Sequence, residues 1–225
     1  MDINFKENSS TMKNSESPWV PQPSTRDYLY TLYTFPNYLK LLNSKEKPYY
    51  NLLKWIIEKQ TFLDDDSYSL PTLGFIAKEL NIGSSKLSLY LKNIYNDILD
   101  LNWHQPELFK KGGQVPCLLM FKHWGHYESF NFGLDIIPRI GEHFHFDFVK
   151  PKLDCSYFHV DDINYEITSK GQRVTISMSS GSSNTYLKLL KDKAYLKREI
   201  SMHEYYNFEI DYELRDKLVK LYSNL

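Results

Sequence analysis

The fold of the first half of this chain is decided by residues 73–91, which read Leu73-Gly74-Phe75-Ile76-Ala77-Lys78-Glu79-Leu80-Asn81-Ile82-Gly83-Ser84-Ser85-Lys86-Leu87-Ser88-Leu89-Tyr90-Leu91. The spacing of apolar residues predicts one helix from Pro71 to Leu80 and a second from Ser84 to about Leu101. Ala77 is small at the point where the second helix must pass close to the first. The stretch therefore predicts two helices joined by a tight turn.

The turn and the second helix have the residue types that this arrangement needs. Asn81 tolerates the left-handed backbone conformation of a tight turn, and Ile82 follows it as an apolar plug. Ser84 or Ser85 is expected to cap the second helix with its hydroxyl group. Apolar residues then recur at helical spacing and predict the face that packs on the first helix: Leu87, Leu91, Ile94 and Ile98.

This pattern resembles the helix-turn-helix superfamily, including its winged-helix branch. The resemblance implies that the second helix is a recognition helix whose N-terminal part meets duplex DNA. A turn at Lys110-Lys111-Gly112-Gly113 would then be the tip of a basic wing hairpin. The residues that the resemblance assigns to DNA contact are Ser84, Ser85, Lys86, Ser88, Lys92, Asn93, Lys110 and Lys111. The same spacing also suits a plain helical bundle that binds another protein.

The charge distribution gives no independent sign of a nucleic-acid partner. The 225 residues carry a formal net charge of −1. When the chain is divided after residues 47, 111 and 185, basic residues exceed acidic ones by at most one in any segment. A DNA-binding surface needs clustered cations, because these displace the counterions of the phosphates. Any such cluster must therefore be assembled in space by the fold.

Composition favours a folded protein of mixed structure. Aromatic residues make up 16% of the chain, which favours strands and packed surfaces. Residues 1–24 are polar, end in three prolines and are expected to form a flexible arm. Residues 25–115 are expected to form the helical domain, with two short helices broken at Pro36, a helix from Tyr49 to Phe62 and an acidic loop from Asp64 to Ser69 before the motif.

Residues 116–180 change in character and predict a small antiparallel β-barrel-like module. Short aromatic or β-branched runs alternate there with turns rich in Gly, Pro and Asp. A Pro138-x-Ile140-Gly141-Glu142 turn that opens a strand is similar to the entry of SH3-like and OB-like barrels. The predicted strands are Val115–Phe121, Phe130–Phe132, Phe144–Val149, Tyr157–Val160, Tyr165–Thr168 and Arg173–Met178. Phe144, Phe146 and Phe148 would share one strand face, either as core or as a stacking platform for single strands.

Residues 181–225 are expected to be a linker followed by helices, in which Leu214, Leu218 and Leu221 share one face. The predicted fold class is therefore α+β, with helices on both sides of the β module.

No stretch approaches the roughly 18 consecutive apolar residues of a membrane helix. The two cysteines do not form a disulfide framework. These features favour a cytoplasmic protein, and frequent Asn, Lys, Ile and Tyr suit an AT-rich bacterial genome.

Histidines and a cysteine in the β module are candidate zinc ligands. Zinc prefers nitrogen and sulfur ligands in tetrahedral sets, often as two close pairs. The candidates are His123, His126, His143, His145, Cys155 and His159. Their spacing matches no zinc signature, and histidine is also common on half-exposed strand faces, so no metal or other cofactor is predicted.

Catalytic motifs are absent from the sequence. There is no phosphate-binding glycine loop, no Gly-x-Ser-x-Gly and no His-Glu-x-x-His. Cys117 lies in an apolar run and is expected to be a packed thiol.

The leading hypothesis is a bacterial DNA-binding protein, either a transcriptional regulator or a mobile-element factor, for which a homodimer is expected. The alternatives are a protein-interaction adaptor and, third, a metal-dependent enzyme in the β module.

Overall fold

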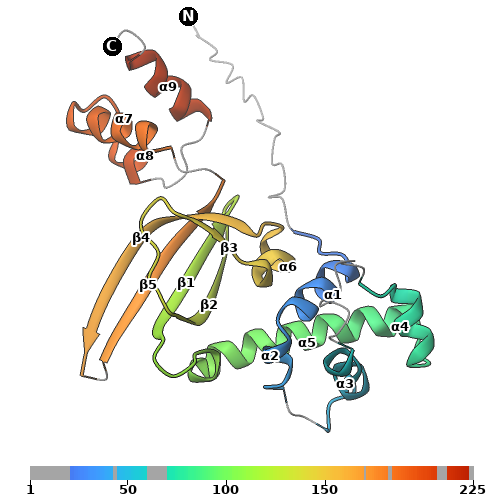
Figure 1. Ribbon diagram of the computed structural model, residues 1–225. Helices are drawn as coiled ribbons and strands as arrows, with labels where there is room; N and C mark the ends of the chain where they lie inside the picture. The colour runs from blue at the N-terminus through green and yellow to red at the C-terminus, as the bar shows by residue number, and fades with distance from the viewer. Residues whose placement is uncertain are drawn as a thin grey trace, which may run out of the picture.

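The computed structural model describes residues 21–42, 45–59, 70–169, 171–181, 184–206 and 212–222. Within these ranges the predicted α+β class is confirmed, since helices precede and follow a curled sheet that resembles half a barrel (Figure 1). Residues 1–20 of the predicted arm at 1–24, and the acidic loop at 64–69, lie outside the described residues.

The first helices begin and end where local sequence signals place them. Helix α1 spans Thr25–Thr34, α2 spans Pro36–Leu39 and α3 spans Tyr50–Glu58. Ser24 caps α1 and forms a reciprocal capping box with Asp27. The predicted break at Pro36 is confirmed, and this proline occupies the first turn of α2, where its missing N–H costs no hydrogen bond.

The helix-turn-helix stretch forms α4 (Leu73–Glu79) and the long α5 (Ser84–His104), which is followed by the 3-10 helix η2 (Pro106–Phe109). With 21 residues, α5 is about 30 Å long. It runs from α4 at one end of the molecule to the sheet at the other (Figure 1). The two ends of α5 therefore lie in different surroundings.

The sheet is mixed, so the prediction of a purely antiparallel module is wrong for one strand pair. Its order is β2-β1-β5-β4-β3, and β5 pairs with β1 in parallel. The register explains this pairing, because Leu119 lies opposite Ile176 and Phe121 opposite Met178, all buried. The sheet also remains open at β2 and β3. The strands are β1 (Val115–His123), β2 (His126–Leu134), β3 (His143–His145), β4 (Tyr157–Thr168) and β5 (Gly171–Ser180).

The predicted strand over Phe144–Val149 is shorter than expected. Strand β3 ends at His145, and the chain continues as the 3-10 helix η3 (Asp147–Val149) and helix α6 (Lys150–Leu153). Phe146 and Phe148 are nevertheless buried and Phe144 is half-buried, which confirms their place in the core. They therefore do not form an exposed stacking platform.

One hydrophobic core joins the N-terminal helices to the sheet. It extends from Tyr28 in α1 to Met178 in β5. At its centre, aromatic rings from distant segments meet at ring-centroid distances near 5 Å: Phe35, Tyr38, Tyr95, Phe109, Phe130 and Phe148. The predicted boundary between residues 115 and 116 consequently separates two layers of one packed unit.

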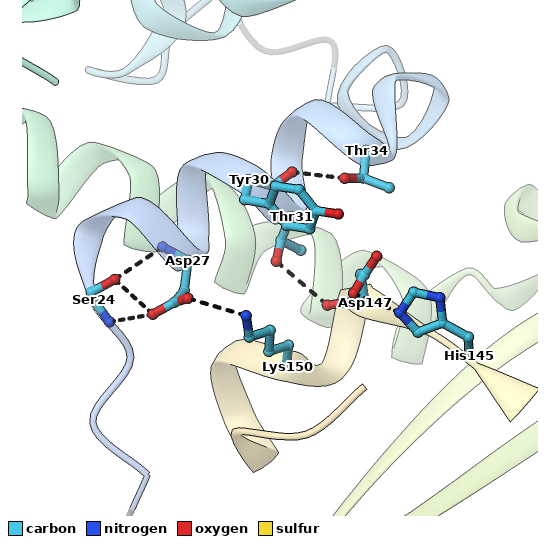
Figure 2. A network of polar contacts seen from close by, with 8 residues as sticks. All are labelled: Ser24, Asp27, Tyr30, Thr31, Thr34, His145, Asp147 and Lys150. Atoms are coloured by element: carbon cyan, nitrogen blue, oxygen red, sulfur yellow. Dashed lines mark hydrogen bonds and ion pairs between the residues drawn. The ribbon is translucent and has the colours of Figure 1, made fainter. Parts of the chain in front are cut away.

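Polar contacts fix α1 against η3 and α6 (Figure 2). Asp27 lies 3.6 Å from the Lys150 ammonium and accepts hydrogen bonds from Ser24. Burial alone would raise the pKa of Asp27, but the Ser24 hydrogen bonds and Lys150 lower it below its ordinary value. His145, the last residue of β3, is bonded to Asp147 of η3, so the end of β3 is also held next to the contact between η3 and α1.

The C-terminal helices have a core of their own. Helices α7 (Thr185–Leu196), α8 (Met202–Tyr206) and α9 (Tyr212–Tyr222) bury Leu187, Leu190, Ala194, Ile200, Leu214, Leu218 and Tyr222. The prediction that Leu221 belongs to this face is wrong. Leu221 is exposed, and Tyr222 takes the inward position because α9 repeats its buried residues every four positions. No helix in the described ranges has the length and apolar character to cross a bilayer.

Candidate nucleic-acid interface

The turn between α4 and α5 has the geometry that its sequence predicts. Asn81 has a φ of 51°, the left-handed conformation that asparagine tolerates better than most residues. The N–H of Ile82 donates to the Ala77 carbonyl at 2.9 Å, and the N–H of Asn81 donates to the Lys78 carbonyl at 3.2 Å. These two bonds form a Schellman motif, which satisfies the last carbonyls of α4 and reverses the chain.

The packing of the two helices also follows the sequence. Ile76, Leu87 and Leu91 are fully buried, and the partly buried Ala77 and Ile82 pack on the same core. Helix α4 lies across the N-terminal end of α5 (Figure 1). The local arrangement is therefore two successive helices that are joined by a tight turn and packed together through one set of apolar side chains.

The N-terminus of α5 is open to solvent. Gly83 is the N-cap residue and no side chain caps the helix, so the predicted capping by Ser84 or Ser85 is wrong. Both serines are already in the first helical turn, and both are exposed. The first backbone N–H groups of a helix have no acceptor within it. Since the first turn of α5 also lacks acidic residues, these donors are available to an anion.

The residues assigned to the outward face of α5 differ in their surroundings. Lys86 and Lys92 are exposed, and the Lys86 ammonium lies 5.6 Å from the centroid of the Tyr90 ring. Asn93 is half-buried. The Ser88 hydroxyl is 2.8 Å from the Thr25 hydroxyl, so it helps to attach α1 to α5. The exposed set is therefore Ser84, Ser85, Lys86 and Lys92, with the apolar Leu89 among them.

Lys110 and Lys111 do not join this set. They follow η2, beyond the other end of α5, and the Lys110–Gln114 segment joins η2 to β1 instead of joining two strands. The prediction of a wing hairpin tip is therefore wrong, because no strand precedes the turn. Lys110 packs against β2 so closely that a Cβ on Gly133 would lie 2.7 Å from the Lys110 Cβ.

The two halves of α5 also differ in charge. Residues 80–96 include Lys86 and Lys92 and contain no acidic residue. Asp97 and Asp100 follow in the C-terminal half. Asp97 is held by the Lys47 ammonium at 2.8 Å and by the Tyr49 hydroxyl. The N-terminal half is therefore a local basic surface on a chain whose net charge is −1.

The C-terminal half of α5 has a structural task that the sequence did not reveal. Asn102 is buried, and its side chain donates to the Asn131 carbonyl and accepts from the Asn131 N–H, each at 2.8 Å. These bonds occupy the backbone groups of β2, an edge strand of the sheet. A buried amide that reproduces a strand's hydrogen bonds protects the edge from other chains. No motif marks Asn102, because its partner lies in another element.

A cleft of about 800 Å³ opens beside this end of α5. It is lined by residues from the helix end, η2 and four strands, among them Trp103, Pro106, Leu118, Phe132, Glu166 and Arg173. Its charged residues are balanced, with Glu107 and Glu166 against Lys110 and Arg173. The charge of the cleft therefore favours no class of ligand.

The candidate metal ligands do not converge. His145 stacks on Tyr157 with ring centroids 4.3 Å apart and is bonded to Asp147 at 3.0 Å. His123 and His126 pair at the tip of the β1–β2 hairpin, and His143 pairs with His159 between β3 and β4. Across the ranges that the structure describes, no three His, Cys, Asp or Glu residues are grouped to hold a metal ion. The metal-dependent alternative therefore has no site in this part of the chain.

The thiols are packed. Cys117 is buried, and burial raises the pKa of its thiol to about 11. Cys155 is half-buried, and burial also raises its pKa. A protonated thiol is a poor nucleophile, so neither cysteine has the properties of a catalytic residue.

A buried polar cluster links the sheet to α7. His159 is buried, its Nδ1 lies 2.9 Å from the Gly181 carbonyl and its Nε2 lies 3.0 Å from Asp161. Lys188 of α7 reaches the same carboxylate at 2.9 Å. The hydrogen bond to Asp161 raises the pKa of His159. Burial would raise the pKa of Asp161, but its bonds to His159, Ser179 and Lys188 lower it well below the ordinary value.

Comparisons with known proteins give no relative for this chain: no family model, no curated protein and no solved structure matches it. The function of the chain is therefore inferred from its own residues.

Proposed function

We propose that this chain is a cytoplasmic protein that binds duplex DNA through the N-terminal half of α5, as a bacterial transcriptional regulator or a mobile-element factor would. The observation that carries the proposal is the meeting of three features at one exposed helix end. These are the uncapped first turn, the exposed Ser84, Ser85 and Lys86, and the absence of acidic residues from 80–96.

Each feature has a separate role in this proposal. Uncapped amides and serine hydroxyls bind phosphate oxygens and fix the helix on the backbone. Lys86 and Lys92 add charge to the solvent-exposed surface of the helix, where both side chains are exposed. Leu89, exposed between them, can contact the methyl group of thymine in the major groove.

The test is binding to a fluorescent random-sequence duplex at low salt and at rising salt. We expect wild-type affinity to fall steeply as salt rises. Lys86→Ala/Lys92→Ala should weaken binding by about tenfold or more and reduce the salt slope by about 2.

The matched control is Lys110→Ala/Lys111→Ala, which removes the same charge beyond the other end of α5. This variant should bind nearly as the wild type does. Equal losses in the two double variants would mean that charge anywhere on the chain suffices, and no binding at low salt would contradict the proposal.

A second function, an adaptor that binds another protein, is favoured by one specific observation. Helix α7 exposes Tyr186, Leu189 and Leu196 on a single face, although its opposite face packs on α8 and α9. If the chain shows no affinity for duplex DNA, Leu189→Glu/Leu196→Glu is the variant expected to disrupt partner binding without loss of folding.

A further inference from the structure

The outer edge of β4 is unpaired over most of its length. Strand β3 pairs with β4 only from Tyr157 to His159, and Val160 exchanges backbone bonds with Gly141 and Glu142. In the described part of the chain, no backbone bond outside the β4–β5 ladder involves residues 161–168. Alternate residues of an antiparallel strand direct their N–H and C=O groups away from the partner strand. The far half of β4 therefore presents a row of unpaired backbone groups.

The side chains of this edge alternate in character. Beyond the bulge between Val160 and Asp162, Ile163, Tyr165 and Ile167 lie on one face of the strand. Ile163 is half-buried, but Tyr165 is 54% exposed and Ile167 is 85% exposed. The other face carries the exposed residues Asp162, Asn164 and Glu166. The hairpin of β4 and β5 projects beyond the helices that cover the rest of the sheet (Figure 1).

Such an exposed strand edge is unusual for a monomeric protein. Sheets normally protect their edges with proline, inward-pointing charge, short strands or covering segments. At the other edges, Asn102 occupies the backbone groups of Asn131 in β2, and β3 is only three residues long. The far half of β4 begins at a bulge and carries the charges of Asp162 and Glu166, but in the described residues it has no proline, no inward-pointing charge and no covering segment.

We propose that two copies of this chain associate by antiparallel pairing of the β4 edge from Asp162 to Thr168, which joins their sheets into one. A two-fold axis is the usual symmetry of a homodimer, and antiparallel edge strands satisfy it. The association stands apart from DNA binding and does not depend on it.

Charge and the length of the overlap together select one register, because an axis at Ile163 or at Ile167 would pair only the nearest few residues of the edge. With the axis at Tyr165, Ile163 faces Ile167 of the second copy and Asn164 faces Glu166 of the second copy. An axis at Asn164 would place Asp162 opposite Glu166, and an axis at Glu166 would place two glutamates opposite each other; both arrangements oppose like charges. A shift by one residue would place apolar side chains opposite polar ones.

The first test is the mass of the full chain in solution, measured by sedimentation equilibrium over a range of concentrations. Wild type should be a dimer that Ile167→Lys converts to a monomer with an unchanged circular dichroism spectrum. Leu196→Lys is the matched control, because Leu196 is 82% exposed and belongs to α7, outside the sheet. This variant should remain dimeric.

The second test addresses the register. Asn164→Lys should tighten the dimer and Asn164→Glu should weaken it, each by roughly two- to thirtyfold, because two cross-strand pairs change. Under mild oxidation Tyr165→Cys should form a covalent dimer rapidly, whereas Ile167→Cys and wild type should not.

A wild type that is monomeric at all concentrations would overturn the proposal. So would a dimer that survives Ile167→Lys, or one in which Asn164→Lys and Asn164→Glu have the same effect. None of these measurements uses DNA, so failure of the dimer and failure of duplex binding are separate results.

Discussion

The two halves of α5 belong to one helix but use polar residues in different ways. In the C-terminal half, Asn102 is buried and satisfies the backbone of β2. In the N-terminal half, Ser84, Ser85, Lys86 and Lys92 are exposed, and neither serine caps the helix. A polar side chain that is buried and paired contributes to stability, whereas one that is exposed contributes little. The polar residues of the N-terminal half are therefore available for a partner, whereas Asn102 is committed to the fold.

The largest expected effect comes from Asn102. Asn102→Leu removes a buried side chain's bonds to the N–H and carbonyl of the half-buried Asn131, so it should lower the free energy of unfolding by about 2–4 kcal/mol. Urea unfolding followed by circular dichroism measures this loss. Asn93→Ala, in the other half of the helix, should change the free energy by less than about 0.5 kcal/mol. Comparable losses in the two variants would remove the distinction between the halves.

Glycines near the two ends of the helix provide the second contrast. Gly133→Ala places a Cβ 2.9 Å from the Lys110 Cα, so it should destabilise the protein by about 1–3 kcal/mol. Gly74→Ala, in α4, meets no atom within 4 Å and should stabilise that helix by roughly 0.5–1 kcal/mol. Thermal unfolding of both variants tests the pair, and a tolerated Gly133→Ala would mean that Lys110 is not packed on β2.

His159 is a buried polar residue like Asn102, but its contribution depends on pH. Its pKa is raised above the ordinary 6.5, mainly by the hydrogen bond to Asp161. The stabilisation that protonated His159 contributes is therefore complete below pH 6.5, and it is lost as the pH rises through the raised pKa of His159. Unfolding experiments from pH 6 to pH 8 should show this loss in wild type and a flatter profile in His159→Gln. Equal profiles would contradict the assignment.

The smallest expected change in stability comes from a variant in the N-terminal half of α5. This variant tests whether that half contributes to DNA binding independently of folding. Ser84→Glu adds a negative charge to an uncapped first turn, so it should raise the free energy of unfolding by about 0.3–1 kcal/mol. The same charge should repel phosphate and weaken duplex binding. A variant that becomes more stable and binds DNA less well shows that the open helix end is a binding surface. A variant that binds DNA as wild type does would argue against it.

Local features of the fold could be predicted from the sequence. The left-handed Asn81, the break at Pro36 and the hairpin of β4 and β5 depend on residues a few positions apart. The parallel pairing of β1 with β5 could not be predicted, since it depends on which strands match across more than fifty residues. Asn102 was missed for the same reason. Gly83, which precedes both serines, is the sequence signal that could have located the helix start.

The candidate site was partly predictable as well. Exposure of Ser84, Ser85, Lys86 and Lys92 follows from the helical period of one segment. The assignments of Ser88, Lys110 and Lys111 depended on segments outside it, and each of these residues has a different position from the one expected. Ser88 meets Thr25, and the two lysines lie beyond the far end of α5. Contacts with segments far away in the chain decide these positions, so the sequence of one segment does not predict them.

The most direct test of the central claim is hydrogen exchange of the full chain with and without a short duplex at low salt. The first amides of α5 have no acceptor within the helix and exchange quickly in the free protein. We expect duplex DNA to slow exchange from Ser84 to Lys92 and to leave exchange at residues 103–111 unchanged. Protection at residues 103–111 alone, or no change anywhere, would contradict the claim that the N-terminal half of α5 contacts DNA.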